Sequence, residues 1–288
     1  MLNEYVVDSK KYFHRCTPLI STRMSDVDTI DAILFYAVAV EKVLKGILLN
    51  VNPVYILEAQ DFCNTAPILY GEKLLSKDSF GKEISKSPNR DVITYRKSLL
   101  RAKEFSPTTN QNCTSLHKLS DYRDTVLHRP TSEINCKDAA QFLIETYPLI
   151  TEGYAKEFGV AVEEFVGDKI HLFDAFGRQA HKISVEKIIE KIGLYNRKWN
   201  RTKNDPGRKE EIAKVNNYVQ EYGGHGVDCP ACGNLAEVDY EPDYDYADGQ
   251  SYMCGVFPVS VKCAFCGLEL FEPSELDYLR MQGKLKAF

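Results

Sequence analysis

Two short cysteine motifs near the end of the chain constrain its fold more than any other feature. Cys229-Pro-Ala-Cys232-Gly233 and Cys263-Ala-Phe-Cys266-Gly267 are two copies of the pattern CxxCG, and 30 residues lie between the two cysteine pairs. Two residues between thiolates let both sulfurs reach one metal from a tight turn, and the glycine that follows tolerates positive φ. Four thiolates in a tetrahedron favour zinc, with an iron–sulfur centre as the minor alternative. The sequence therefore predicts one structural zinc ion bound by Cys229, Cys232, Cys263 and Cys266.

The cysteine pattern leaves other chemistry open at this site. A redox dithiol pair would also use CxxC, although neither pair lies in a βαβ context. Cys254 and His225 lie near the two pairs and are further candidate ligands. A closed set of four thiolates leaves no open position for a substrate, so we expect the zinc to be structural rather than catalytic. Nine cysteines, an odd number, without a recognisable signal peptide argue against a disulfide framework and favour a cytoplasmic protein.

The pattern of apolar and polar residues changes at Gly223-Gly224. Before this point apolar residues recur every three to four positions, which predicts helices, including one from Asp26 or Asp28 to Pro53 and one after Asp138 that Pro148 kinks or ends. After it, short β-like runs are followed by a helix that Ser274 and Asp277 open as a capping box. The fold class predicted is mainly α with a small β domain, divided into a helical domain (1–155), a helical connector (156–222) and a metal-binding domain (223–288).

Charge is distributed unevenly along the chain. The net charge is −5, but residues 223–288 carry −7 and residues 1–222 carry +2. Within the connector, Tyr195–Lys209 holds six basic residues and one Asp, and we expect a basic loop there. A tryptophan among cations could stack a base while the cations hold phosphates. The candidate RNA-binding residues are Arg197, Lys198, Trp199, Arg201 and Lys203, and the alternative is a solvated basic loop.

The most informative helical segment is Asp121-Tyr-Arg123-Asp124-Thr-Val-Leu-His128-Arg-Pro130. On periodicity alone it is the end of an amphipathic helix that Thr114 or Ser115 caps. Asp124 lies one turn before His128, so it could hydrogen-bond the imidazole and raise its pKa. Arg123 and His128 are five residues apart, about 140° around an ideal helix, and converge only if the last turn loosens or long side chains wrap toward a shared cleft. The alternative is an ordinary surface histidine at a helix end.

The order of Arg123, Asp124, three further residues and His128 resembles the R-x4-6-H signature of HEPN domains. The preceding helix, AILFYAVAVEKVLKGILL, resembles the early HEPN helix that carries a polar residue, here Glu41, in an apolar stripe. The helix DAAQFLIETYPLI resembles the closing HEPN helix. The resemblance covers about residues 1–155 and implies a HEPN-like helical bundle, followed by a C-terminal segment that resembles zinc ribbons.

Many HEPN domains are metal-independent endoribonucleases that act as homodimers with two motifs facing one cleft. The resemblance implies that His128 is the general base or acid at the ribose 2′-OH or the leaving oxygen, and that Arg123 stabilises the phosphorane-like charge. It implies that Asp124 and Glu41 orient these two side chains. The implied role is RNA cleavage by a toxin, antiviral-defence or stress effector, with a possible regulatory protein partner and no membrane. Pro130 stands where one subgroup carries a tyrosine that a partner nucleotidyltransferase modifies, which argues against that partner.

Two rival functions remain open at the level of sequence. A non-catalytic binding module would dimerise through the helical bundle and dock protein or nucleic acid through the ribbon. A DNA-binding regulator is disfavoured by the charge of −7 on residues 223–288. His117, Cys113 and Cys136 are weaker candidates, which we expect to be core or surface residues rather than catalytic groups.

Overall fold

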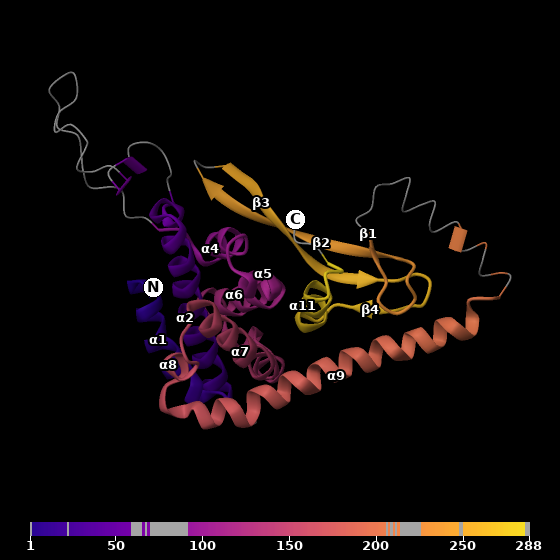
Figure 1. Cartoon of the computed structure of the whole chain (residues 1–288), viewed down its shortest axis with the longest axis horizontal. Coiled ribbons are helices and arrows are strands. Elements are labelled where there is room, and N and C mark those ends of the chain that lie inside the picture. The colour runs from indigo at the N-terminus through magenta and orange to yellow at the C-terminus, as the bar shows by residue number, and fades with distance from the viewer. Residues whose placement is uncertain are drawn as a thin grey trace, which may run out of the picture.

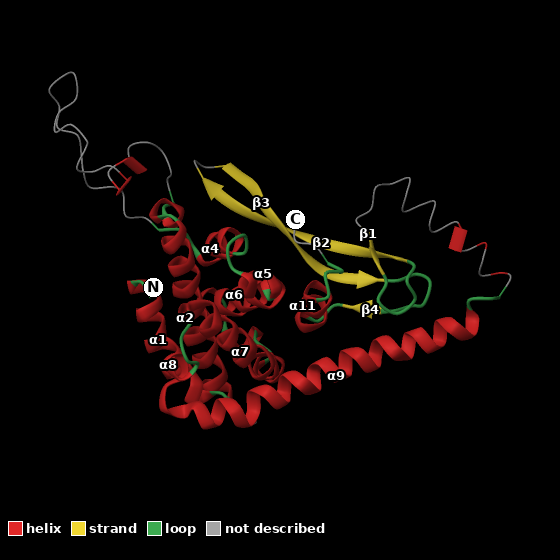
Figure 2. Ribbon diagram, in the orientation of Figure 1, coloured by secondary structure: helices red, strands yellow, loops and turns green. Residues whose placement is uncertain are grey.

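The computed structural model of the chain describes residues 2–21, 23–58, 65–66, 68–69, 92–205, 207, 210, 212–213, 226–247 and 250–285, and of 172–183, 243–247, 250–252 and 254 it describes the backbone only. It is mainly helical with a small antiparallel sheet near the C-terminus, which confirms the predicted fold class (Figures 1 and 2). Gly223-Gly224, His225 and most of the helix predicted over 206–222 lie outside the described residues.

Helix α2 (Asp26–Val51) forms the centre of the helical body. Its start is a capping box, because the Ser25 hydroxyl accepts from the Asp28 amide at 3.1 Å and the Asp28 carboxylate accepts from the Ser25 amide. Apolar residues are buried along its whole length, so other helices pack on several sides of it. These are α1 (Glu4–Cys16), α4 (Tyr95–Ala102), α6 (Cys113–His128) and α7 (Cys136–Phe158).

Short elements connect these helices: η1 (Thr17–Leu19), η2 (Pro53–Ile56), α5 (Pro107–Gln111), η4 (Thr131–Glu133), α8 (Glu163–Val166) and η5 (Gly167–Lys169). Helix α7 continues through Pro148 to Phe158, so of the two predicted effects of this proline, the end of the helix is wrong. Tyr147 and Ile150 on either side of the proline are both buried in the core. Their packing outweighs the cost of a proline inside a helix, where the lost backbone hydrogen bond and the clash of the ring with the preceding turn together cost about 3 kcal/mol.

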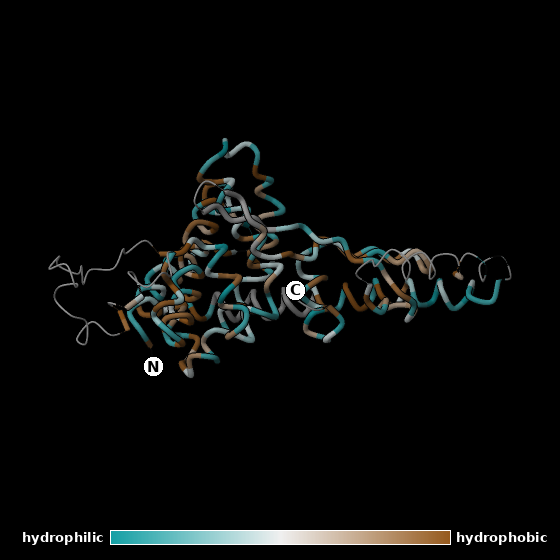
Figure 3. Tube along the Cα trace, turned by 90° about the horizontal axis from the view of Figure 1, so that it is seen from above, coloured by the Kyte–Doolittle hydropathy of each residue, from teal (hydrophilic) through white to brown (hydrophobic). Residues whose placement is uncertain are grey.

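Helix α9 (Ile170–Thr202) is 33 residues long and leads from the helical body toward the part of the chain that carries the sheet and the four clustered cysteines (Figure 1). The segment predicted to be a basic loop is helical as far as Thr202, which corrects that prediction. The reason is an apolar stripe at helical spacing: Ile192, Tyr195 and Trp199 all pack against the second core of the protein. Most residues in the last turns of α9 are hydrophilic (Figure 3).

The strands form one antiparallel sheet in the order β1 (Gly226–Asp228), β2 (Leu235–Ala247), β3 (Gln250–Lys262) and β4 (Glu269–Leu270). β2 and β3 make a long hairpin in which Glu237 pairs with Lys262. The hairpin reaches back over α4 (Figure 1). Gly255 permits this approach, because a Cβ there would lie 2.6 Å from the Leu100 side chain of α4.

Helix α11 (Pro273–Met281) ends the described fold and joins its two parts. Its capping box is formed by Glu272 and Glu275 rather than by Ser274 and Asp277, which corrects the sequence prediction. Pro273 occupies the first helical position, where its fixed φ and missing N–H are tolerated, and this sets the helix start two residues earlier. The Asp277 side chain therefore takes no part in the capping box of α11 and is available for another contact.

The buried residues fall into two hydrophobic cores that do not follow the predicted boundaries. The first core holds residues between Val6 and Val166 together with Phe257 of β3. The second surrounds the four cysteines and includes residues of α11, with part of α9 packed against it. The expected boundary at residue 155 falls inside α7. The β hairpin and α9 each contribute to both cores: Phe257 and Ile170 pack in the first, and Val261 and Ile192 pack in the second.

No helix in the described ranges combines the length and the apolar character needed to cross a membrane.

Candidate functional site

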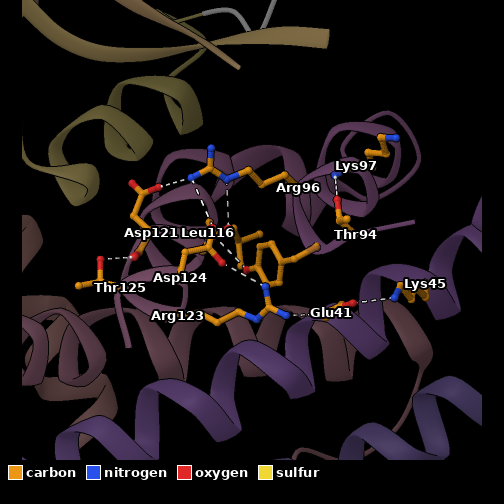
Figure 4. Close-up of polar contacts among 12 residues, drawn as sticks. Glu41, Lys45, Thr94, Arg96, Lys97, Leu116, Asp121, Arg123, Asp124 and Thr125 are labelled. Atoms are coloured by element: carbon orange, nitrogen blue, oxygen red, sulfur yellow. Dashed lines mark hydrogen bonds and ion pairs between the residues drawn. The ribbon is translucent and has the colours of Figure 1, made fainter. Parts of the chain in front are cut away.

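The structure brings together three of the four residues predicted to be catalytic. Arg123 of α6 places Nη1 3.2 Å from Oδ1 of Asp124 and Nη2 3.6 Å from Oε2 of Glu41 (Figure 4). Glu41 lies on α2 and also accepts a 2.6 Å hydrogen bond from Lys45, one turn further along. Its position in the apolar stripe of α2 points it at the helix that packs on that stripe. The Arg123 guanidinium is therefore held between two carboxylates and remains about a quarter exposed.

Arg96 is a member of this cluster that sequence reasoning missed. Its Nη2 lies 2.8 Å from Oδ1 of Asp121 and 3.8 Å from Oδ2 of Asp124, and its Nε donates to the Ser120 hydroxyl. Asp124 therefore lies between two guanidinium groups (Figure 4). Arg96 is on α4, and only the packing of α4 on α6 places it there. No spacing in the sequence could have indicated it.

His128 is the last residue of α6, and its side chain is exposed. In the described part of the chain its ring has no hydrogen-bond or ion-pair partner, so the hydrogen bond expected from Asp124 is absent. The reason is that Asp124 is occupied by the two arginines. The last turn does not loosen, because the Arg129 amide still donates to the Thr125 carbonyl at 3.0 Å. The His128 imidazole and the Arg123 guanidinium of one chain therefore do not contact each other.

Together, the cluster around Arg123 and the nearby end of α6 offer a fixed cation, Arg123, and an accessible base, His128. Arginine stays charged at every accessible pH, and two carboxylates fix the orientation of Arg123. An accessible imidazole is suited to proton transfer near neutral pH. Among the described residues, the only group of three or more side chains arranged to bind a metal is the set of four cysteines, which lies elsewhere in the fold.

The four predicted metal ligands lie together at the base of the sheet. Their sulfurs are all within 4.8 Å of one another, with 3.6 Å between Cys229 and Cys266 and 3.5 Å between Cys232 and Cys263. A tetrahedral ion with metal–sulfur bonds of about 2.3 Å requires sulfurs about 3.8 Å apart. The four thiols therefore fit one metal ion. The side chain of Cys254 and the residue His225 lie outside the described parts of the chain.

The surroundings of the cysteines are built for this geometry. Gly233 and Gly267 have φ of 74° and 76°, and their amides donate to the carbonyls of Cys229 and Cys263 to close each turn. The Asn234 side chain donates to the Cys232 sulfur at 3.3 Å. From α9, the Asn196 side chain donates to the Ala231 carbonyl at 2.5 Å, which attaches the first cysteine turn to the long helix.

The candidate RNA-binding residues divide between two faces of α9. Arg197, Lys198 and Arg201 line an open depression of about 430 Å³, where the Lys198 ammonium lies 5.6 Å from the centre of the Tyr195 ring. Trp199 faces the other way and packs edge-on against Phe265, with ring centres 6.3 Å apart. Lys203 follows the helix, and its ammonium donates to Asn200. The cations are available to a ligand, whereas Trp199 is a packing residue.

The weaker candidates have structural surroundings. The His117 ring lies 4.1 Å from the centre of the Phe257 ring, with Nδ1 3.7 Å from an Asp121 oxygen. Cys113 is buried, and burial raises the pKa of its thiol to about 11, which disfavours the nucleophilic thiolate. Cys136 is half-buried, and burial likewise raises the pKa of its thiol.

Comparison of the chain with protein-family models, with curated proteins and with solved structures finds no match.

Proposed function

We propose that the protein is a metal-independent endoribonuclease of HEPN type that acts in the cytoplasm as a toxin, antiviral-defence or stress effector. One observation carries the proposal: Arg123 is held between Glu41 and Asp124, and an accessible His128 ends the same helix. These are the residue types, in the order along the chain, that the HEPN resemblance implies. The site needs no metal, because a base and a permanent cation suffice for attack by a ribose 2′-OH.

In the proposed reaction, His128 removes the proton from the 2′-OH, and the 2′-oxygen attacks the adjacent phosphorus. The 5′-oxygen leaves and takes up a proton. The products are a 2′,3′-cyclic phosphate, which water can open to a 3′-phosphate, and a 5′-hydroxyl. Arg123 binds a non-bridging phosphate oxygen and stabilises the charge that builds up on it. Glu41 and Asp124 act as positioning residues for Arg123. DNA lacks the 2′-OH and binds without being cut.

A homodimer through the helical body supports this chemistry better than one chain does. Within one chain the last turn of α6 stays helical, and His128 does not meet Arg123. Two copies related by a twofold axis would place a pair of motifs across one cleft. Leu127, which is half exposed next to His128, offers an apolar contact for the second copy.

The remaining features have supporting roles in the proposal. The four cysteines hold one structural Zn²⁺, which the fit of their spacing to a tetrahedral ion supports. The cations of α9 (Arg197, Lys198 and Arg201) contact RNA phosphates.

The decisive experiment incubates purified protein with total RNA in EDTA, at a chelator concentration at which elemental analysis shows that zinc is retained. Wild type is compared with His128→Ala and with His171→Ala, a matched change at an exposed histidine on α9. We expect His128→Ala to lose about 10²–10⁴-fold in cleavage rate and His171→Ala to keep the wild-type rate. A requirement for magnesium, equal cleavage of DNA, or full activity of His128→Ala would each refute the proposal.

A non-catalytic binding module is the second candidate. It is favoured by the fact that Arg123 is already balanced by two carboxylates, and by the lack of an orienting partner for His128 among the described residues. This function would take over if the wild type binds RNA in a gel-shift assay but cuts none.

A further inference from the structure

Helix α9 packs against the rest of the chain along one side. Ile188 is buried, and Ile192 and Trp199 follow it at helical spacing and pack against the second core. Figure 1 shows the helical body and the sheet on this side, whereas the opposite side runs along the edge of the molecule. We call that opposite side the outer face of α9. At about 100° per residue, its members among the described side chains are Glu186, Glu190, Gly193, Arg197 and Arg201.

The charges of the outer face are separated along the helix. Glu186 and Glu190 are one turn apart, and further toward the C-terminus Arg197 and Arg201 are also one turn apart. Like charges at this spacing repel each other, whereas opposite charges would stabilise an exposed helix. Within the described residues, Glu190, Arg197 and Arg201 make no ion pair that would relieve this repulsion. The outer face therefore presents an acidic half and a basic half.

The lysines in the same stretch lie on a different side of α9. Lys187 and Lys191 line the groove that α9 forms with α7 and the start of α11. In this groove the Lys191 ammonium lies 2.6 Å from a carboxylate oxygen of Glu275. The charges of the two lysines are directed toward α7 and α11 rather than toward the outer face.

Gly193 lies between the acidic and the basic half, where no described neighbour requires a glycine. Inside a helix, glycine is less favourable than alanine because it loses more backbone entropy. The glycines of α2 and α7 have a packing reason: a Cβ would lie 2.5 Å from the Val6 side chain at Gly46 and 2.5 Å from the Thr108 side chain at Gly153. A Cβ at Gly193 would meet only the flexible end of Arg197, at 3.5 Å. Gly193 thus leaves room for another helix to approach the backbone of α9.

Two exposed apolar side chains flank this glycine. Ile189 is 52% exposed and Leu194 is 56% exposed, and they project to opposite margins of the outer face. Apolar residues on both sides of a narrow point, with charges beyond them, are the arrangement of a helix that packs against another helix. Burial of these side chains would add an apolar contribution to such a contact.

The charge pattern is complementary to itself when a second copy of α9 lies antiparallel. Glu190 and Arg197 are seven residues apart, so they project within about 20° of each other. Their midpoint falls between Gly193 and Leu194. A twofold axis at this point places Glu190 of each copy beside Arg197 of the other and brings the two Leu194 side chains together. A contact of this symmetry forms each favourable pair twice.

We propose that two copies of the chain pair through the outer faces of α9, antiparallel, with a twofold axis between Gly193 and Leu194. The contact goes beyond the proposed function, because α9 carries no residue of the cluster around Arg123. One twofold axis serves this contact and the contact through the helical body, so the assembly stays a dimer. Each arginine has five N–H donors, so a carboxylate of the second copy leaves donors of Arg197 and Arg201 for RNA phosphates.

Analytical ultracentrifugation of the full chain without RNA measures the dissociation constant of the dimer. Glu190→Arg and Arg197→Glu should each weaken the dimer about 10–100-fold, because each creates two contacts between like charges. An equimolar mixture of the two variants should form a heterodimer that regains most of the wild-type affinity, because both contacts then join opposite charges. The matched control is Lys203→Glu, which makes the same change of charge about 120° around the helix from Arg197 and should dimerise as the wild type does.

A steric variant tests the close approach of the two helices. Gly193→Leu should also weaken the dimer at least about 10-fold, because the new side chain fills the space for the second helix. Leucine is a better helix former than glycine, and the charge variants change exposed side chains, so we expect all of these proteins to fold. Circular dichroism of each variant should show the helix content of the wild type.

A monomeric wild type, unchanged dimerisation of both charge variants, or a mixture that stays monomeric would each overturn the pairing. A Lys203→Glu effect as large as that of Arg197→Glu would show a general effect of charge and would also overturn it. RNA cleavage is measured separately. A dimer that no change on α9 weakens, together with RNA cleavage, refutes only the pairing of α9. Pairing without any cleavage refutes only the proposed ribonuclease.

Discussion

Asp277 of α11 caps the N-terminus of α6, and its removal gives a sharp test of how the two parts of the protein depend on each other. Its two carboxylate oxygens accept from the Thr114 amide at 3.1 Å, the Ser115 amide at 3.0 Å and the Ser115 hydroxyl at 2.5 Å. Asn112, the residue at the N-cap position, makes no side-chain cap, because its amide group donates to the Thr108 carbonyl instead. The cap of α6 therefore comes from a helix about 160 residues further along the chain.

The expected cost of Asp277→Ala follows from these bonds. The substitution leaves two buried backbone N–H groups without an acceptor, at about 1–3 kcal/mol each, while the Ser115 hydroxyl can rotate to another partner. Release of a fully buried carboxylate offsets part of this cost. We expect a net loss of about 2–4 kcal/mol in the free energy of unfolding. Asp277→Asn keeps one acceptor oxygen and should lose about 1–2 kcal/mol.

Urea unfolding, monitored by circular dichroism, measures the free energy of unfolding. Hydrogen exchange of the capped amides reports directly on the loss of the cap. The amides of Thr114 and Ser115 should exchange about 30–1000-fold faster in Asp277→Ala, the equivalent of 2–4 kcal/mol. Asp239→Ala is the matched control, because the partly exposed Asp239 pairs with the solvent-exposed Lys262 and accepts from the Ser260 hydroxyl, contacts that water can largely replace. The reasoning fails if the two alanine variants lose the same stability, or if exchange in the first turn of α6 is unchanged.

The pH dependence of the same group has a defined sign. Burial raises the pKa of Asp277 above its ordinary value of 3.8, against the bonds from Ser115 and the charge of Arg280. Between 3.8 and the raised folded value, the folded state binds more protons than the unfolded state, so stability falls as the pH rises through that window. Asp277→Asn carries no such proton. The stability difference between wild type and Asp277→Asn should be largest on the acid side and shrink as the pH rises, which urea titrations at several pH values would show.

Three further predictions concern the metal, the assembly and the arginine. Cys263→Ser combined with Cys266→Ser should reduce zinc from about one ion per chain to none by elemental analysis, while the circular dichroism of the helical body is largely retained; unchanged zinc would contradict the assignment. Light scattering at micromolar concentration should give about 65 kDa, twice the chain mass of 32.7 kDa, and a mass near 33 kDa would argue against the dimer. Arg123→Ala should slow RNA cleavage by at least about 10²-fold with RNA binding largely kept, because its charge matters most in the transition state; a loss confined to binding would assign Arg123 to RNA docking instead.

The sequence predicts features that arise from local periodicity and spacing. The apolar stripe of α2 and the paired CxxCG turns depend on residues within a few positions of one another, and both lie where they were expected. The resemblance associates Glu41 with Arg123, and the Glu41 carboxylate lies 3.6 Å from Nη2 of Arg123. A polar residue in an apolar stripe faces the helix that packs on that stripe. The prediction of a basic loop was wrong. It gave more weight to the density of charged residues than to the helical spacing of Ile192 and Trp199.

The features that sequence reasoning missed depend on packing between distant segments. Arg96 reaches Asp124 across two helices, and Asp277 reaches Ser115 across about 160 residues. Thr114 and Ser115 look like helix caps in the sequence, but both are inside α6 and receive a cap instead. The spacing of residues within one segment does not indicate which side chain of a distant segment will contact it.

The remote cap of α6 also sets an order of events during synthesis. Translation adds about 5–20 residues per second, so roughly 8–30 s separate the appearance of α6 from that of Asp277. Throughout this interval the nascent helix that carries Arg123 and His128 has an uncapped first turn, while the chain is still attached to a ribosome made of RNA. A site helix that is completed by a segment about 160 residues further along reaches its full stability only after that segment has been made. In the proposed ribonuclease this delay would protect the ribosome and the messenger that produce it.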